Sequence, residues 1–194
     1  YFSLKPRINS NLKVNDHPLK VERHNVESEG VSIISKDYED RYFQDNGYEE
    51  SKEVYVDGNN LEERWESFLG SSFTIGELGF GLGLNFLTTL KCWLKKDRSF
   101  FLDYIGIDKK VLVKENLDLL EKTFPNLSEE IKILRDCDVI GHNGFECISL
   151  CNLKVRLILV TDEVEKALSG ICESNIDAWY LDGFDPKKNQ EMWS

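Results

Sequence analysis

After residue 70, short apolar runs alternate with longer segments in which apolar residues recur at helical spacing. This pattern predicts strands and helices in turn. Residues 72–78 and 102–107 are short apolar runs typical of buried strands. Between them, leucines recur at helical spacing over residues 84–96 and predict a helix. Strands this apolar need cover on both faces, so the pattern favours an α/β fold whose mainly parallel sheet is covered by helices.

The alternation continues toward the C-terminus. We predict a helix over residues 111–124, ended by Pro125, and a third strand over residues 131–134. Residues 146–160 alternate around a turn at Asn152 and Leu153, which predicts a β-hairpin inserted before a helix over residues 162–172. Residues 176–181 then predict a fourth core strand.

The first 69 residues lack this rhythm. Short alternating segments at residues 31–34 and 54–56 predict strands among polar turns, and residues 61–69 predict a helix. We therefore divide the chain into a strand-rich N-terminal extension, residues 1–69, packed on a main domain, residues 70–194.

Composition and charge narrow the class of protein. The 194 residues are 41% hydrophobic and 30% charged, which suits a globular core and excludes disordered and collagen-like chains. No apolar run reaches the roughly 20 residues of a membrane span, and the N-terminus lacks the pattern of a signal peptide. The formal net charge, 24 basic minus 35 acidic residues, is −11. This charge argues against broad binding to nucleic acid but leaves a local basic face open.

The cysteines predict a cytoplasmic protein with free thiols, because there are five of them and none are spaced as CxxC. The separation of Cys147 and Cys151 could suggest metal ligands. In a strand, however, positions four apart lie about 13 Å from each other. We therefore favour half-buried apolar roles for these two side chains and expect no metal site.

A glycine-rich turn follows the first strand of the main domain. Gly79, Gly81 and Gly83 give the spacing GxGxG, not the GxGxxG of dinucleotide enzymes. Such a turn lets the backbone pass close to the ribose and amino-acid portions of a ligand without a pyrophosphate. Asp108 ends the next strand, where its carboxylate could accept two hydrogen bonds from a ribose diol. The alternative is a plain tight turn with a solvated aspartate.

Two more aspartates end predicted strands on the same edge. Asp162 could accept a hydrogen bond from an adenine amino group or could cap the following helix, and the sequence favours neither use. Asp182 falls next to the expected topological switch point, where open α/β sheets bind ligands. There it could hold the reactive end of a ligand, or it could only cap a loop.

Four blocks of sequence carry a resemblance to a known family. They are SKDYEDRYF at residues 35–43, GNNLEER at 58–64, GFGLGLNFL at 79–87 and DAWYLDGFDPKKNQEMW at 177–193. In this order and spacing they resemble the methyltransferase domain of the bacterial enzyme that makes 5-methylaminomethyl-2-thiouridine in tRNA. The resemblance implies a Rossmann-like, class I fold that uses S-adenosylmethionine (SAM). It also implies N-methylation of the 5-aminomethyl group of 2-thiouridine at the tRNA wobble position.

The resemblance further assigns roles to individual residues. Asp182 would be catalytic, holding the amine that is methylated; we expect it to orient the amine first and to act as a base second. The residues expected to bind the cofactor are Glu77, Gly79, Phe80, Gly81, Gly83, Asn85, Asp108, Lys109, Asp162 and Asp182. The residues expected to contact the substrate are Asn59, Phe184, Lys187 and Lys188. Phe184 or Tyr180 could stack on the flipped base, although core packing is the favoured role for Tyr180.

The expected partner is the anticodon loop of tRNA, with a separate flavin-dependent oxidase acting upstream and no membrane or metal involved. Two alternatives remain open, a SAM-dependent methyltransferase of a small amine and a non-catalytic SAM-binding remnant. A class I methyltransferase has three more strands after the one that ends at Asp182, and the chain starts with Tyr1. We therefore expect a domain that is incomplete at its C-terminus.

Overall fold

A five-stranded mixed sheet forms the centre of the computed structural model, which describes residues 21–26, 30–35, 40–44, 46–110, 112–136, 144–171 and 175–183. The strand order is β6-β7-β5-β4-β8. Four strands run parallel, β4 (Ser72–Leu78), β5 (Phe101–Asp108), β7 (Val155–Thr161) and β8 (Ala178–Leu181). The edge strand β6 (Gly144–Leu150) is antiparallel to β7. The predicted α/β, Rossmann-like architecture is confirmed.

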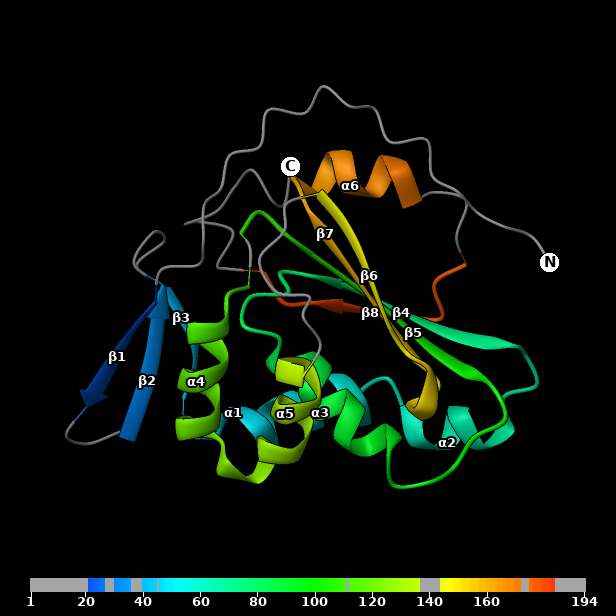
Figure 1. Cartoon of the computed structure of the whole chain (residues 1–194), viewed down its shortest axis with the longest axis horizontal. Coiled ribbons are helices and arrows are strands. Elements are labelled where there is room, and N and C mark those ends of the chain that lie inside the picture. The colour runs from blue at the N-terminus through cyan, green and yellow to red at the C-terminus, as the bar shows by residue number, and fades with distance from the viewer. Residues whose placement is uncertain are drawn as a thin grey trace.

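Helices cover both faces of this sheet, as the apolar strands require (Figure 1). One face carries α6 (Val164–Ile171) over a small cluster that includes Leu78, Ile107 and Ala167. The opposite face of the sheet is covered by α3 (Leu84–Trp93) and α5 (Ser128–Asp136), and α4 (Lys114–Thr123) lies beside these two helices. The larger core lies on this second side and encloses the rings of Phe73, Phe86 and Tyr104.

The strand predicted over residues 131–134 is wrong, because these residues belong to helix α5. Ile131 and Leu134 are buried and lie on one face of α5 at a spacing of three, and the buried Leu127 precedes them in the 3-10 turn before the helix. Arg135 also ties α5 to α4 through Asp118 and Glu121, at 2.9 and 2.8 Å. A segment of four residues, here Ile-Lys-Ile-Leu, is too short for its hydrophobic period to tell a strand from a helix, and the tertiary contacts decide for the helix.

The predicted hairpin is confirmed as β6 and β7, joined by a 3-10 turn over Cys151–Leu153. The expectation that it is an insertion is wrong, since β7 pairs in parallel with β5 and is itself the third parallel strand of the sheet. Cys147 and Cys151 are both exposed, which also corrects the half-buried roles expected for them. In the described ranges, no helix is long and apolar enough to cross a membrane.

The strand predicted over residues 54–56 is wrong as well. These residues lie in a π-helical segment, η1 (Lys52–Asp57), between α1 (Gly47–Ser51) and α2 (Leu61–Ser67). Lys52 Nζ binds both carboxylate oxygens of Asp57, at 2.8 and 2.7 Å, and so spans the five-residue turn. The turn buries Val56 and leaves Val54 exposed, whereas a strand would place these two positions on the same face.

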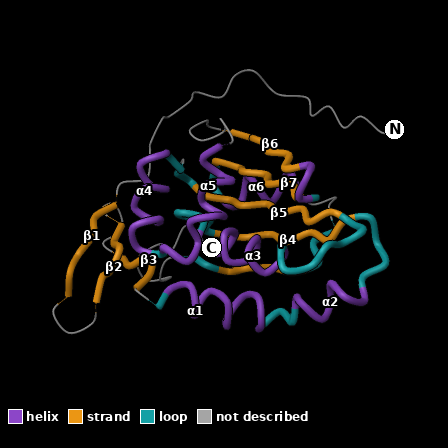
Figure 2. Tube along the Cα trace, turned by 60° about the horizontal axis from the view of Figure 1, so that its bottom comes forward, coloured by secondary structure: helices purple, strands orange, loops and turns teal. Residues whose placement is uncertain are grey.

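Near the N-terminus, three strands form a separate antiparallel sheet, β1 (Val21–Val26), β2 (Gly30–Ser35) and β3 (Asp40–Gln44). The strand predicted over residues 31–34 is confirmed as part of β2. Figure 2 shows this sheet beside α4 and apart from the central sheet. The Phe43 ring of β3 packs on Phe124 with ring centroids 5.1 Å apart. The division of the chain at residue 69 stays a prediction.

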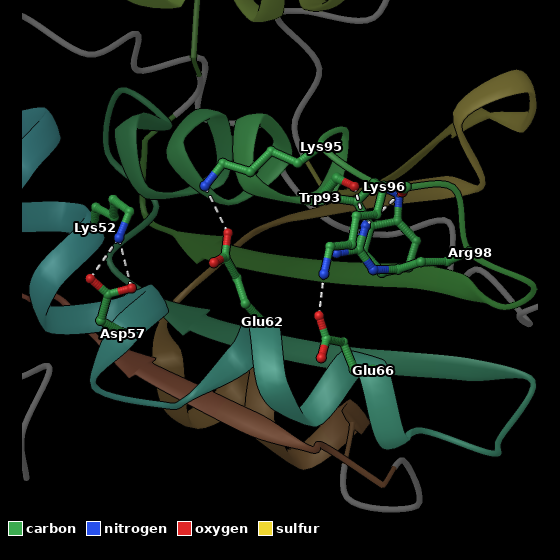
Figure 3. Close-up of polar contacts among 8 residues, drawn as sticks. All are labelled: Lys52, Asp57, Glu62, Glu66, Trp93, Lys95, Lys96 and Arg98. Atoms are coloured by element: carbon green, nitrogen blue, oxygen red, sulfur yellow. Dashed lines mark hydrogen bonds and ion pairs between the residues drawn. The ribbon is translucent and has the colours of Figure 1, made fainter.

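Ion pairs join α2 to the residues that follow α3 (Figure 3), and a stacked arginine adds a further contact between these two parts. Lys95 Nζ lies 2.8 Å from Glu62 Oε1, and Lys96 pairs with Glu66 one helical turn further on. The Arg98 guanidinium lies over the rings of Trp65 and Trp93, 4.9 and 4.6 Å from their centroids. Together with the buried Trp65, these contacts hold the segment of residues 47–67 against the central domain.

Candidate functional site

The glycine turn between β4 and α3 has a backbone that only glycine adopts without strain. Gly79, Gly81 and Gly83 have φ angles of +87°, +52° and +82°. A Cβ atom on Gly79 would lie 2.2 Å from the carbonyl oxygen of Asp182. The turn therefore presents bare backbone at the carboxyl ends of two neighbouring strands, β4 and β8.

Asp108, at the end of β5, is tied to this turn by backbone donors. Its carboxylate accepts hydrogen bonds from Gly81 N at 2.8 Å and from Lys110 N at 2.9 Å. Burial raises the pKa of Asp108 above its ordinary value, and the amides of Gly81, Lys110 and Lys109 act against that rise. One carboxylate oxygen thus lies against the glycine turn, and the other lies against the backbone amide of Lys110 after β5.

The Phe80 ring is part of the core beneath the turn. It is buried against Gly106, where an added Cβ would come within 2.2 Å of the ring. Only the backbone of Phe80 is then free to face a cofactor. The ring instead supports the turn from below, packing 6.4 Å from the rings of Phe86 and Tyr104.

A network of buried polar groups joins Glu77 to Asp182. The Nδ2 of Asn85 donates to Glu77 Oε1 at 2.7 Å and to Asp182 Oδ2 at 2.6 Å. The Tyr104 hydroxyl donates to the second oxygen of Glu77 at 2.8 Å. Glu77 is fully buried, and this burial, with the nearby Asp182 charge, raises its pKa well above the ordinary value.

Asp182 lies where the strand order reverses, between β4 and β8, which is the topological switch point of the sheet. Its backbone N–H donates to the Leu78 carbonyl at 3.0 Å. The residue reaches solvent, but its carboxylate lies against Asn85 and Tyr55 beside the buried Glu77. Desolvation raises the pKa of Asp182, while the hydrogen bonds from Tyr55 and Asn85 act in the opposite direction.

Sequence reasoning missed four members of this network, Ser51, Tyr55, Thr89 and Tyr104. Tyr55 lies 4.8 Å from the Tyr180 ring, centroid to centroid. Tyr180 is fully buried, and its hydroxyl lies 3.0 Å from Thr89 Oγ1, so the core role favoured for it is confirmed. For Thr89 and Tyr104 the available signal was a hydroxyl group within an apolar helix or strand, whereas Ser51 and Tyr55 lie in polar segments that carry no such signal.

The remaining candidates lie around this centre or outside the described residues. Asp162 donates its N–H to the Asp108 carbonyl at 3.0 Å, and its carboxylate accepts from Glu163 N at 2.8 Å at the start of α6. Asn59 Nδ2 donates to the Tyr55 carbonyl at 2.9 Å. Phe184, Asp185, Lys187 and Lys188 lie outside the described residues. No group of three metal-ligating side chains occurs in the described part of the chain.

The glycine turn and the acids around it have the chemistry that SAM requires. A turn of bare backbone lies beside the strand-end carboxylate of Asp108, which can accept hydrogen bonds from a diol. The carboxylate of Asp182, a residue that reaches solvent at the switch point, suits a positive charge of the cofactor. The fold and the site therefore define the class as a Rossmann-like SAM-dependent methyltransferase. A family model described as S-adenosyl-L-methionine-dependent methyltransferase matches residues 125–194, and the chain belongs to this family.

Within the family, the chain is similar to the tRNA 5-methylaminomethyl-2-thiouridine biosynthesis bifunctional protein MnmC. It is 40% identical over 169 residues to the protein of Leptospira borgpetersenii, covering 84% of this chain and 25% of that protein. The Legionella pneumophila protein is 34% identical over 177 residues, and the match covers 82% of this chain and 27% of that protein. The chain thus spans about a quarter of the length of these curated relatives.

A solved structure supports the same fold. The crystal structure of MnmC2 from Aquifex aeolicus superimposes with a TM-score of 0.66 at 21% sequence identity. The match covers 91% of this chain and 54% of that one. The resemblance to the methyltransferase domain of the bifunctional enzyme is confirmed.

Proposed function

We propose that this chain methylates the exocyclic amine of 5-aminomethyl-2-thiouridine at the tRNA wobble position. The observation that carries the proposal is the carboxylate of Asp182 at the switch point, held beside the glycine turn by Asn85 at 2.6 Å. A primary amine is a cation when protonated and a hydrogen-bond donor when neutral, so a carboxylate suits it in both states. The similarity to MnmC over 84% of the chain supports tRNA as the substrate.

SAM would supply the methyl group to be transferred, activated on a sulfonium. We assign its methionine part to Glu77 and the turn of Gly79, Gly81 and Gly83, with Asn85 holding Glu77 in place. Asp108, with the backbone of Lys109, would take the ribose, and Asp162 would take the adenine edge. Asp162 lies next to Asp108 and also contacts the start of α6, so both uses expected for it remain compatible with its position.

The contribution of the protein is then alignment and removal of a proton. An alkylamine is mostly protonated near neutral pH and cannot attack in that state. We assign to Asp182 the orientation of the amine and, second, acceptance of its proton. Desolvation raises the pKa of Asp182 and so makes the carboxylate a stronger base than it is in water.

We further propose that the substrate reaches the site as a base of the tRNA anticodon loop, where unpaired bases can turn outward. Phe184, Lys187 and Lys188 directly follow Asp182 and Gly183 in sequence, and we keep them, with Asn59, as candidate substrate contacts. The similar proteins are described as bifunctional. In keeping with the family resemblance, we propose that a flavin-dependent oxidase activity acts upstream in the cytoplasm and supplies the amine.

The test is mass spectrometry of tRNA nucleosides after incubation with SAM and the protein. The substrate is tRNA from a strain that accumulates 5-aminomethyl-2-thiouridine. We expect the 5-methylaminomethyl nucleoside to appear with the wild-type chain and to be lost with Asp182→Asn. Binding of SAM without any methylated nucleoside would contradict the proposal and favour a non-catalytic, SAM-binding role.

A second candidate is a SAM-dependent methyltransferase of a small amine. The formal net charge of −11 favours it, because the phosphates of tRNA are repelled by such a chain. In addition, Lys52, Lys95 and Lys96 are each paired with a carboxylate. Incubation of the same protein with free 5-aminomethyl-2-thiouridine and with simple alkylamines separates the two functions. Methylation of these amines but not of tRNA would favour the second.

A further inference from the structure

We propose that Ser51, in the segment before the central sheet, is a positioning residue for Asp182 that acts through the carboxamide of Asn85. This inference rests on the proposed function, because it concerns the carboxylate that would hold the amine. Ser51 is the last residue of α1, and its hydroxyl donates to Asn85 Oδ1 at 2.6 Å. Both residues are buried, with exposed fractions of 4% and 5%.

The chemistry of a carboxamide explains why Ser51 matters. Asn85 has one oxygen that accepts and one nitrogen that donates two hydrogen bonds. Both donors are used, since Nδ2 lies 2.7 Å from Glu77 Oε1 and 2.6 Å from Asp182 Oδ2. Rotation of the amide by half a turn would point its oxygen at two carboxylates. The hydroxyl of Ser51 supplies the donor that keeps the oxygen on the opposite side.

The packing of α1 against α3 holds the Ser51 hydroxyl within hydrogen-bond distance of the Asn85 carboxamide. Asn85 lies in the first turn of α3, directly after the glycine turn. At the other end of α1, a Cβ atom on Gly47 would lie 3.2 Å from Leu84, so the two helices approach closely. The segment of residues 47–67, which is tied to α3 by the ion pairs of Figure 3, thus completes the site from outside the sheet.

Loss of the hydroxyl should loosen the amide and change the titration of Asp182. The hydrogen bond from Asn85 lowers the pKa of Asp182, so a weaker bond should let that pKa rise. Glu77 on β4, Tyr104 on β5, Glu50 on α1 and Tyr55 on η1 also act on this group and are unchanged in a Ser51 variant. The direction of the change therefore reports on Ser51 and Asn85.

The test is NMR of the unliganded chain, followed through the side-chain amide signals of Asn85 between pH 4 and pH 8. An Asn85→Ser variant assigns the signals. We expect Ser51→Ala to move the titration midpoint upward by about 0.5 pH unit or more, as the loss of a hydrogen bond to a carboxylate predicts. Ser51→Thr keeps the hydroxyl and should restore the midpoint of the wild type.

The matched control is Thr88→Val, which removes a buried hydroxyl that has no hydrogen-bond partner and lies outside the network. It should leave the midpoint unchanged. Equal midpoints for wild type and folded Ser51→Ala would overturn the inference, as would a Ser51→Thr variant that behaves like Ser51→Ala. Melting curves establish that each variant is folded.

An activity measurement separates this inference from the proposed function. Single-turnover methylation of the aminomethyl-containing tRNA should show its acid limb at higher pH in Ser51→Ala, with recovery in Ser51→Thr. If the wild type does not methylate the tRNA, the proposed function fails, and the NMR comparison still decides the role of Ser51. If the wild type is active and the acid limb does not move in Ser51→Ala, the inference fails alone.

Discussion

At the scale of single residues, the site is a set of carboxylates held by neutral donors. Asp108 is held by backbone amides, and Glu77 by Tyr104 and Asn85. These donors fix the direction of each side chain, while burial raises the pKa of all three acids and so favours their protonated forms. The arrangement explains how three acids can lie close together in one fold, because their raised pKa values lessen the repulsion between like charges.

Replacement of Asp108 by alanine should weaken SAM binding. The loss of two hydrogen bonds to a charged group corresponds to roughly 2 to 3 kcal/mol, measured by calorimetry. The control is Asp103→Asn on the same strand, because Asp103 pairs with Arg156 at 2.5 Å and is not part of the site. Unchanged affinity in the Asp108 variant would remove this residue from the cofactor site.

Asp182→Asn should reduce turnover much more than cofactor affinity. The substitution keeps the shape of the side chain but removes its charge, so kcat should fall about 100-fold or more, the usual scale for a group that handles a proton. Single-turnover methylation with saturating SAM measures the effect. Asp57→Asn, at an exposed carboxylate paired with Lys52, serves as the control. A wild-type rate in the Asp182 variant would remove Asp182 from the mechanism. The next candidate to hold the amine would be Asp185, the acid three positions further along the chain.

At the scale of elements, the connection from β4 to α3 restricts the sequence most strongly, because its backbone conformation requires glycine at three positions. Three glycines with positive φ turn the backbone within five residues, and the amides of Gly79 and Phe80 bind the Ile107 carbonyl at 2.9 and 3.1 Å. The turn is thereby joined to the end of β5. A change in the turn should affect Asp108 and Asp182 together, because it lies between them.

Gly79→Ala should destabilise the protein and abolish SAM binding. The added Cβ meets the Asp182 carbonyl at 2.2 Å and requires a left-handed backbone, which together cost about 1 to 3 kcal/mol or more. Chemical denaturation measures the free energy of unfolding. Gly170→Ala is the matched control, since nothing lies within 4 Å of its Cβ position in α6. It should stabilise the protein by about 0.5 to 1 kcal/mol.

At the scale of the whole molecule, the site lowers the stability of the fold at neutral pH. Glu77 is fully buried and Asp182 lies beside it, and burial raises the pKa of both. A carboxyl whose pKa is higher in the folded chain binds more protons there than in the unfolded chain. The free energy of unfolding therefore falls as pH rises from near the ordinary pKa of 4.5 toward the raised value of Glu77.

Glu77→Gln should remove much of this pH dependence. The glutamine keeps two hydrogen bonds, because its oxygen can accept from Asn85 and its nitrogen can donate to the Tyr104 hydroxyl. The variant should be more stable than the wild type at pH 7 by about 1 kcal/mol or more, since one pKa unit corresponds to about 1.4 kcal/mol. Melting temperatures from pH 4 to pH 8 without SAM check this. A constant difference between the two proteins across that range would contradict it.

What the sequence determined by itself was local. The helical spacing of leucines, the strand of residues 72–78 and the GxGxG turn were read correctly, because each depends on backbone conformation or on burial within a few neighbouring residues. The acid at the end of β5 also followed from strand and turn order. The family resemblance added the cofactor, which periodicity alone does not specify.

Only the tertiary structure decided the rest. Residues 131–134 became helix because their apolar side chains pack against neighbours that a four-residue window does not contain. Ser51 and Asn85 are 34 positions apart, and Tyr55 and Leu181 are 126 apart, so no sequence spacing could predict their contacts. Hydrogen bonds over such separations exist only when packing brings the segments together, and for this reason the polar network around Asp182 belongs to the fold and not to any motif.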